Sequence, residues 1–159
     1  AEWARTAGLD SGPGGRLRLD LPMTALRVVF DPEHLRRVLV NLLDNALRYI
    51  GKHADSLQIS TGVAANGQAG LQVWSDGPPL EKTVERHLFE PFFSSESRSS
   101  GLGLYVCREL CERHGACIAY QRIPRHTARG LVEGNAFSLV FRPAQTAHAA
   151  DGPFDTPLV

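Results

Sequence analysis

The chain has 159 residues, of which 43% are hydrophobic, and its 17 Lys and Arg residues balance 17 Asp and Glu residues. This length suits one globular domain with a full core and is too short for two. The balanced charge excludes a global field that favours nucleic acid or an anionic membrane surface, so any phosphate site must be local. The sequence has no apolar run of the roughly 18 to 20 residues that a membrane span needs, and its first residues lack a signal-peptide pattern.

Three cysteines, Cys107, Cys111 and Cys117, fit neither a disulfide framework nor a four-ligand zinc site. Cys107 and Cys111 are four residues apart on an expected helix, which predicts small buried thiols. Free thiols indicate a reducing compartment, so we expect a cytoplasmic chain. The start at Ala1 without Met favours a fragment of a longer protein.

Three regions differ in composition. Residues 1–15 end in Asp-Ser-Gly-Pro-Gly-Gly and are expected to be a linker or the end of a preceding helical region. Residues 16–142 carry the periodic segments and are expected to form the domain. Residues 143–159 lack periodicity, so we expect a flexible C-terminal tail.

The first half of the domain predicts two strands and one long helix. Leucines alternate with polar residues over 16–21, the period of a half-buried strand, and a short strand is expected at 27–30. Asp31 is a suitable N-cap for a helix with Pro32 in its first position. Apolar residues then recur at helical spacing as far as Ile50.

The middle of the chain predicts a hairpin and two helices. Residues 57–63 and 70–75 flank a polar loop and are expected to pair antiparallel. The Pro- and Ser-rich region that follows is expected to be loop with a short helix near 80–88. A further helix begins near Gly103 and ends where Gly115 can adopt a left-handed cap.

A closing hairpin is expected from residues 118–122 and 135–141. Its loop is expected to carry Pro124 and Gly130, because both residues interrupt strands.

A polar stripe lies on the long helix. Asn41, Asn45 and Arg48 are spaced i, i+4 and i+7, so they share one helix face. Amide oxygens and a guanidinium suit a hydrated Mg²⁺ and a polyphosphate. Asn on an amphipathic helix is more often simply solvated, so the stripe needs support from elsewhere.

Gly101 to Leu104, Gly-Leu-Gly-Leu, opens the later helix. The first amides of a helix lack internal partners and carry partial positive charge, so this turn can hold an anion. A Gly-x-Gly string alone is commonly an ordinary turn. The P-loop pattern does not occur in the sequence, which argues against that type of nucleotide site.

Four segments together resemble a known family. In order, Asn41 to Tyr49, Ser75 to Pro79, Phe89 to Phe93 and Ser99 to Leu104 are similar to the N, G1, F and G2 boxes of sensor histidine kinases. The resemblance covers roughly residues 16–142, the ATP-binding catalytic domain of that family, which belongs to the GHKL superfamily. Residues 88–93 and 101–110 look most like kinases of the nitrogen-regulation and type IV pilus groups.

The resemblance implies an α+β fold. We expect a two-layer α/β sandwich of the GHKL type, with a mixed sheet of about five strands, about three helices on one face and a short ATP lid.

The resemblance also implies roles for the long helix. Asn41 and Asn45 are expected to hold Mg²⁺ against the phosphates of ATP. Arg48 stands where the family usually has a phosphate-contacting Lys, and Tyr49 is expected to lie on the adenine. Asn41 and Arg48 are the expected catalytic residues.

By the same resemblance, Phe93 is expected to pack at the base of the lid, although adjacent Phe92 and Phe93 are equally typical of plain core. Arg98 is then the cation of the lid. Phosphate contacts are expected from the turn made by Gly101, Leu102, Gly103 and Leu104.

The chain departs from the family pattern in the G1 and G2 boxes. Ser75 stands where the family has an Asp that accepts a hydrogen bond from the adenine amino group, and Asp76 and Gly77 follow. Either Ser75 makes a weaker contact, or Asp76 shifts to replace it. Losing a charged acceptor costs about 1 to 2 kcal/mol, or roughly tenfold in affinity. Ser99 replaces the first Gly of the G2 box, and Glu96 stands where Lys is frequent.

Histidines do not supply the phosphoacceptor here. His34 lacks the helical hairpin that carries the family's acceptor and is expected to be a surface residue near a helix start. The remaining histidines form no spacing with Cys or carboxylates that predicts a metal site.

The function implied is transfer of the γ-phosphoryl of Mg-ATP to a His on a dimerisation domain outside this chain, and onward to a response regulator. We expect a monomeric fragment of a homodimeric parent, a class often anchored in the inner membrane. One alternative is a degenerate GHKL domain with weak or no nucleotide binding that acts as a protein scaffold. Another is a hydrolysing relative, but those place a Glu base at the position of Asn41, and an amide cannot take up a proton usefully.

Overall fold

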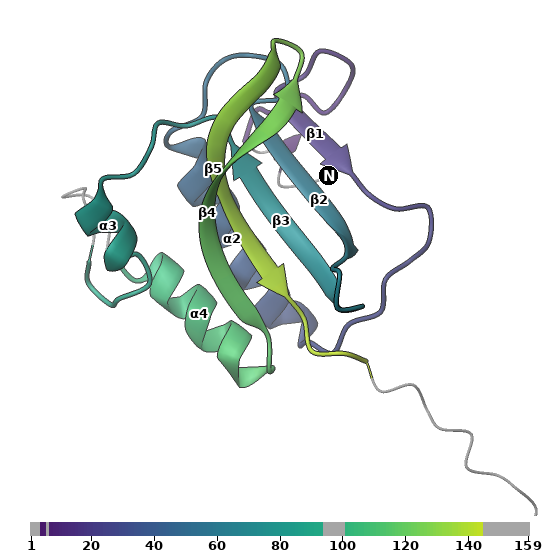
Figure 1. Ribbon diagram of the computed structural model, residues 1–159, viewed down its shortest axis with the longest axis vertical. Helices are drawn as coiled ribbons and strands as arrows, with labels where there is room; N and C mark the ends of the chain where they lie inside the picture. The colour runs from purple at the N-terminus through teal and green to yellow at the C-terminus, as the bar shows by residue number, and fades with distance from the viewer. Residues whose placement is uncertain (1–3, 6, 94–100, 145–159) are drawn as a thin grey trace, which may run out of the picture.

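The computed structural model describes residues 4–5, 7–93 and 101–144. Within these residues the strands are β1 Leu17–Asp20, β2 Leu57–Val63, β3 Ala69–Ser75, β4 Cys117–Thr127 and β5 Gly130–Val140, and the labelled helices are α2 Pro32–Leu47, α3 Lys82–Arg86 and α4 Gly103–Arg113. The five strands form a mixed sheet in the order β1-β2-β3-β5-β4, and helices lie against one of its faces (Figure 1). The predicted α+β fold is therefore confirmed.

The sheet is antiparallel except at one edge, where β1 runs parallel to β2. The strand predicted over 27–30 is wrong, because these residues form no strand. Val28 and Phe30 are instead partly buried against the core. The Phe30 ring meets Phe141 edge-on with centroids 5.8 Å apart, so side-chain packing, and not a ladder, holds this segment.

Strand β1 only partly matches its prediction. Leu17 is buried, whereas Leu19 and Leu21 are 48% and 60% exposed. Leucine and polar residues alternate along this edge strand as predicted, but only Leu17, at the start of the strand, is buried.

Helix α2 starts as predicted. Asp31 is the N-cap, and its Oδ1 accepts a hydrogen bond from the His34 amide at 3.0 Å, with Pro32 in the first turn. The helix ends at Leu47, three residues before the predicted end at Ile50. One face is buried against the sheet and α4, and its buried residues are Val38, Leu42, Leu43 and Ala46.

Helix α4 also ends as predicted. Gly115 adopts φ +69° and its amide donates to Glu112 O at 3.0 Å, while the Ala116 amide donates to Cys111 O at 2.9 Å. These two bonds satisfy carbonyls at the end of the helix and turn the chain directly into β4.

The closing hairpin is longer than predicted, with strands of 11 residues each. Pro124, predicted in the loop, lies inside β4 opposite Glu133. A proline is tolerated there because β4 is an edge strand, where a missing N–H costs no pairing on the open side.

The far end of this hairpin bends over the sheet face turned away from α2 and α4, as the curled β4 and β5 in Figure 1 show. The indole Nε1 of Trp74 donates to Ile123 O at 2.9 Å, and Gln58 Nε2 donates to His126 O at 2.9 Å. Trp74 is fully buried beneath this bend. A Cβ at Gly134 would lie 2.3 Å from the indole, so only glycine permits this close approach.

Several predictions fall outside the described residues. These are the lid residues Glu96 and Arg98, and most of the predicted tail, residues 145–159. Over the described ranges, none of the helices combines the length and apolar character that crossing a membrane requires.

Candidate functional site

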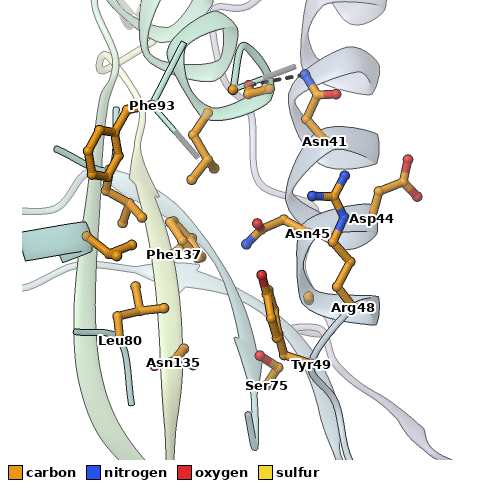
Figure 2. A pocket seen from close by; sticks show the side chains of 16 residues that line it. Asn41, Asp44, Asn45, Arg48, Tyr49, Ser75, Leu80, Phe93, Asn135 and Phe137 are labelled. Atoms are coloured by element: carbon orange, nitrogen blue, oxygen red, sulfur yellow. Dashed lines mark hydrogen bonds between the residues drawn. The ribbon is translucent and has the colours of Figure 1, made fainter. Parts of the chain in front are cut away.

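A cavity of about 450 Å³ opens between α2, the start of α4, the end of β3 and the segment that includes α3. Its size is typical of a small-molecule site. Figure 2 shows polar side chains along the α2 wall and mostly apolar side chains on the opposite wall. The cavity therefore has one polar side and one apolar side.

The α2 wall carries the predicted polar stripe. Asn41, Asn45, Arg48 and Tyr49 all line the cavity, because residues three and four apart lie on one helix face. Asp44 also lines it, a residue that sequence reasoning missed although it lies between two predicted residues. Figure 2 shows these side chains stacked along successive turns of the helix.

The start of α4 forms the adjacent wall. Gly101, Gly103 and Leu104 line the cavity, whereas Leu102, the N-cap of α4, does not. The first amides of this helix have no acceptor within it, and they lie at the cavity end of α4. The Gly-Leu-Gly-Leu turn and the α2 stripe thus face one cavity.

Gly101 fixes where α4 begins. Its φ is +67°, and its carbonyl accepts a hydrogen bond from the Phe92 amide at 3.1 Å. A Cβ at this position would lie 2.7 Å from the carbonyl carbon of Phe92. This hydrogen bond therefore holds together the two backbone segments that flank residues 94–100. Phe93, the neighbour of Phe92, lines the cavity.

Helices α2 and α4 contact each other at the site. Asn41 Nδ2 donates to Gly103 O at 3.4 Å, and Cys107 Sγ donates to Val38 O at 3.7 Å. Burial raises the pKa of Cys107 to about 12 and that of Cys111 to about 11. The predicted buried thiols are confirmed, and they act as small apolar side chains in the hydrophobic core.

The inner end of the cavity is formed by two paired residues of the sheet. Ser75 ends β3 and is the register partner of Asn135 in β5. Both line the cavity, and they are 5% and 8% exposed. Asn135 was not predicted, because its place opposite Ser75 depends on strand pairing that the sequence does not specify.

Asp76 does not line the cavity. Its Oδ1 accepts from the Gly51 amide at 2.8 Å, and its Oδ2 accepts from Ser56 Oγ and from Arg129 Nη2, each at 2.7 Å. The alternative in which Asp76 turns towards the base disagrees with these contacts.

Gly77 also lies outside the cavity lining. A Cβ there would be 3.2 Å from Tyr49 Cβ, so this glycine lets the loop after β3 approach the end of α2 closely.

Most residues of the apolar wall were not predicted from the sequence. Leu80, Val84 and Leu88 come from the segment around α3, and Phe137 comes from β5. The four-residue spacing of these three residues is a helical signal in the sequence, but it does not reveal what the helix faces. The last residue missed is Ala46 of α2.

The structure corrects the expectation that His34 is a surface residue. His34 is not a free surface residue, since it is partly buried and its Nδ1 lies 2.8 Å from His114 Nε2, which joins the start of α2 to the end of α4. Arg98 lies outside the described residues. Among the residues that are described, no cluster of His, Cys, Asp and Glu could hold a metal ion by itself.

The sequence matches the family described as histidine kinase-, DNA gyrase B- and HSP90-like ATPase over residues 30–145. It is 37% identical over 128 residues to the sensor protein kinase PilS of Pseudomonas aeruginosa, an alignment that covers 76% of this chain and 24% of that protein. The chain thus spans about a quarter of the length of this relative.

Solved structures agree. The catalytic domain of histidine kinase ThkA superposes with a TM-score of 0.66 at 26% identity, covering 88% of this chain and 82% of that one. Full-length ShkA, solved in complex with AMPPNP, has the same fold with a TM-score of 0.62 at 18% identity, covering 79% of this chain and 25% of that one.

The chain belongs to the family of histidine kinase-, DNA gyrase B- and HSP90-like ATPases, and within it to the ATP-binding catalytic domains of sensor histidine kinases. The resemblance found in the four sequence segments is confirmed. The cavity lies where these segments meet.

Proposed function

We propose that the cavity binds Mg-ATP and presents its γ-phosphoryl for transfer to a histidine on a dimerisation domain outside these 159 residues. The observation that carries this proposal is that the α2 stripe lines one cavity together with Gly101, Gly103 and Leu104 of the turn that opens α4. A triphosphate between them meets amide donors on one side and amide oxygens with a guanidinium on the other.

Mg²⁺ suits the donor set on α2. Asn41 and Asn45 offer neutral amide oxygens, and Asn41 already donates its Nδ2 proton to Gly103 O, which leaves its Oδ1 as the acceptor end. Mg²⁺ commonly takes few protein ligands and keeps waters and phosphate oxygens. Asn41 and Asn45 would hold the ion from the α2 side, and when bound it would supply positive charge against the phosphates.

Phosphoryl transfer requires mainly positioning and charge stabilisation. The amides at the start of α4 and the Arg48 guanidinium stabilise charge on the transferred group. Asn41 cannot act as a general base, so no residue at this position activates water, and the proposal favours a protein acceptor over hydrolysis. Asn41 and Arg48 are therefore the proposed catalytic residues.

The base end of the nucleotide is proposed to lie between Tyr49 and the apolar wall, with its edge towards Ser75. Phe93 closes the side of the cavity next to Gly101. After transfer, the phosphohistidine is proposed to pass its phosphoryl group to an Asp of a response regulator.

Calorimetric titration with ATP tests the proposal, with and without Mg²⁺. We expect Mg²⁺-dependent binding, and labelling of the separately supplied histidine-bearing domain of the parent protein when ATP carries a γ-³²P label. Absence of binding at millimolar Mg-ATP would instead support the scaffold alternative, for which the fold and the comparisons give no supporting observation.

A further inference from the structure

The inner end of the cavity is short of hydrogen-bond acceptors. Ser75 and Asn135 are the polar side chains there, paired across β3 and β5. A hydroxyl both donates and accepts, whereas a carboxylate only accepts. The hydrogen-bond donors and acceptors that these two side chains present to the cavity decide which edge of a nucleotide base can bind there.

Asn135 has no acceptor capacity left. Arg122 Nη1, which can only donate, lies 2.9 Å from Asn135 Oδ1, so the orientation of the amide is settled. The Tyr120 hydroxyl also donates to this oxygen, at 2.7 Å, and the Nδ2 donates to Pro78 O at 2.8 Å. Both lone pairs of the oxygen are therefore used, and the amide can offer the cavity only an N–H.

The nearby carboxylates do not supply an acceptor either. Asp76 is held by Gly51, Ser56 and Arg129 on the other side of the strand end. Among the described lining residues Asp44 is the one carboxylate, and Figure 2 shows it on α2, with its carboxyl group turned away from Ser75. The side chains that line the inner end thus carry no charge themselves, the Arg122 guanidinium lies behind Asn135, and Ser75 Oγ is the accepting side-chain atom.

We propose that this site does not distinguish an amino group from a keto group at position 6 of a purine, and that it accepts both classes of purine nucleoside triphosphate. The inference rests on the proposed function and concerns only the base. The Ser75 hydroxyl accepts from a 6-amino group or rotates to donate to a 6-keto oxygen. A carboxylate would bind the amino group and repel the keto oxygen, which is how an acceptor-only group creates specificity.

Calorimetric titration of the full chain with Mg-ATP and with Mg-ITP tests the inference, because inosine and adenosine differ at position 6 and in the proton on N1. We expect dissociation constants within about fivefold of each other. In Ser75→Asp we expect ITP to bind at least about tenfold more weakly relative to ATP, because a fixed charge faces the keto oxygen. Ser11→Asp adds the same charge at an exposed position and should leave the ratio unchanged.

Each outcome is distinguishable. A wild-type preference for ATP over ITP of more than about fivefold overturns the inference and leaves the proposed function standing. Failure of both nucleotides to bind overturns the two together. If Ser75→Asp folds and keeps the wild-type ratio, Ser75 does not read the base. Ser75→Ala gives a milder check, because both nucleotides should then weaken to a similar degree.

Discussion

Arg129 Nη2 donates to Asp76 Oδ2 at 2.7 Å and ties the turn between β4 and β5 to the end of β3, 53 residues earlier in the chain. The Asp76 side chain is only 3% exposed, and the Gly51 amide and Ser56 hydroxyl also donate to it. Because successive side chains of a strand point to opposite faces, this anchoring leaves Ser75 facing the cavity.

Asp76→Ala should lower the free energy of unfolding by about 2 to 3 kcal/mol, because it leaves the partly buried Gly51 amide and the buried Ser56 hydroxyl without their charged acceptor. Urea denaturation measures this loss. Asp20→Ala is the matched control, since it removes an exposed ion pair with Arg18 and should change stability by less than about 0.5 kcal/mol. Equal effects of the two substitutions would contradict a structural role for Asp76.

Asn45→Ala should abolish Mg²⁺-dependent ATP binding while leaving the fold intact, because it removes one proposed ligand from a partly exposed helix position. Calorimetry in the presence of Mg²⁺ and of EDTA measures the effect. Asn66→Ala, in the exposed β2–β3 turn, should bind ATP as the wild type does. Full binding by Asn45→Ala would remove the metal assignment.

Gly101→Ala should destabilise the domain by about 1 to 3 kcal/mol, because the residue has a positive φ and its Cβ would collide with the Phe92 backbone. Thermal unfolding should show a lower melting temperature, and ATP affinity should fall as the start of α4 shifts. Gly12→Ala has open space around it and should do neither. An unchanged melting temperature for Gly101→Ala would show that the turn adapts freely.

Iodoacetamide at pH 8 should label one cysteine in the native protein and three after denaturation. Cys117 is exposed, whereas burial keeps Cys107 and Cys111 inaccessible and protonated. Mass spectrometry of the digested protein identifies the labelled positions. Rapid labelling of Cys107 in the native state would mean that α2 and α4 separate readily.

The same two thiols predict how stability depends on alkaline pH. Their folded pKa values, about 12 and about 11, lie above the ordinary value of 9.0. The stability gained by burying neutral thiols is therefore complete below pH 9 and is lost as pH rises through 11 to 12. Urea midpoints measured from pH 8 to 11 should fall less in a Cys107→Ala, Cys111→Ala double variant than in the wild type.

Local sequence was sufficient to predict where a helix begins or ends when interactions between residues close in the chain define that end. The start of α2 follows from Asp31 and Pro32, and the end of α4 follows from Gly115, because caps involve residues only a few positions apart. The spacing of Asn41, Asn45 and Arg48 placed three polar side chains on one face for the same reason. The strand predicted over residues 27–30 was wrong because apolar β-branched residues also occur in irregular segments that pack on a core.

Helices α2 and α4, the β2–β3 hairpin and the family could be predicted from local sequence, because periodicity, caps and ordered motifs are properties of neighbouring residues. The pairing of Asn135 with Ser75, the contact between Asp76 and Arg129 and the covering of Trp74 by the β4–β5 hairpin emerged only from the folded molecule. These relationships join strands that are distant in the chain, and their register depends on the packing of the whole sheet.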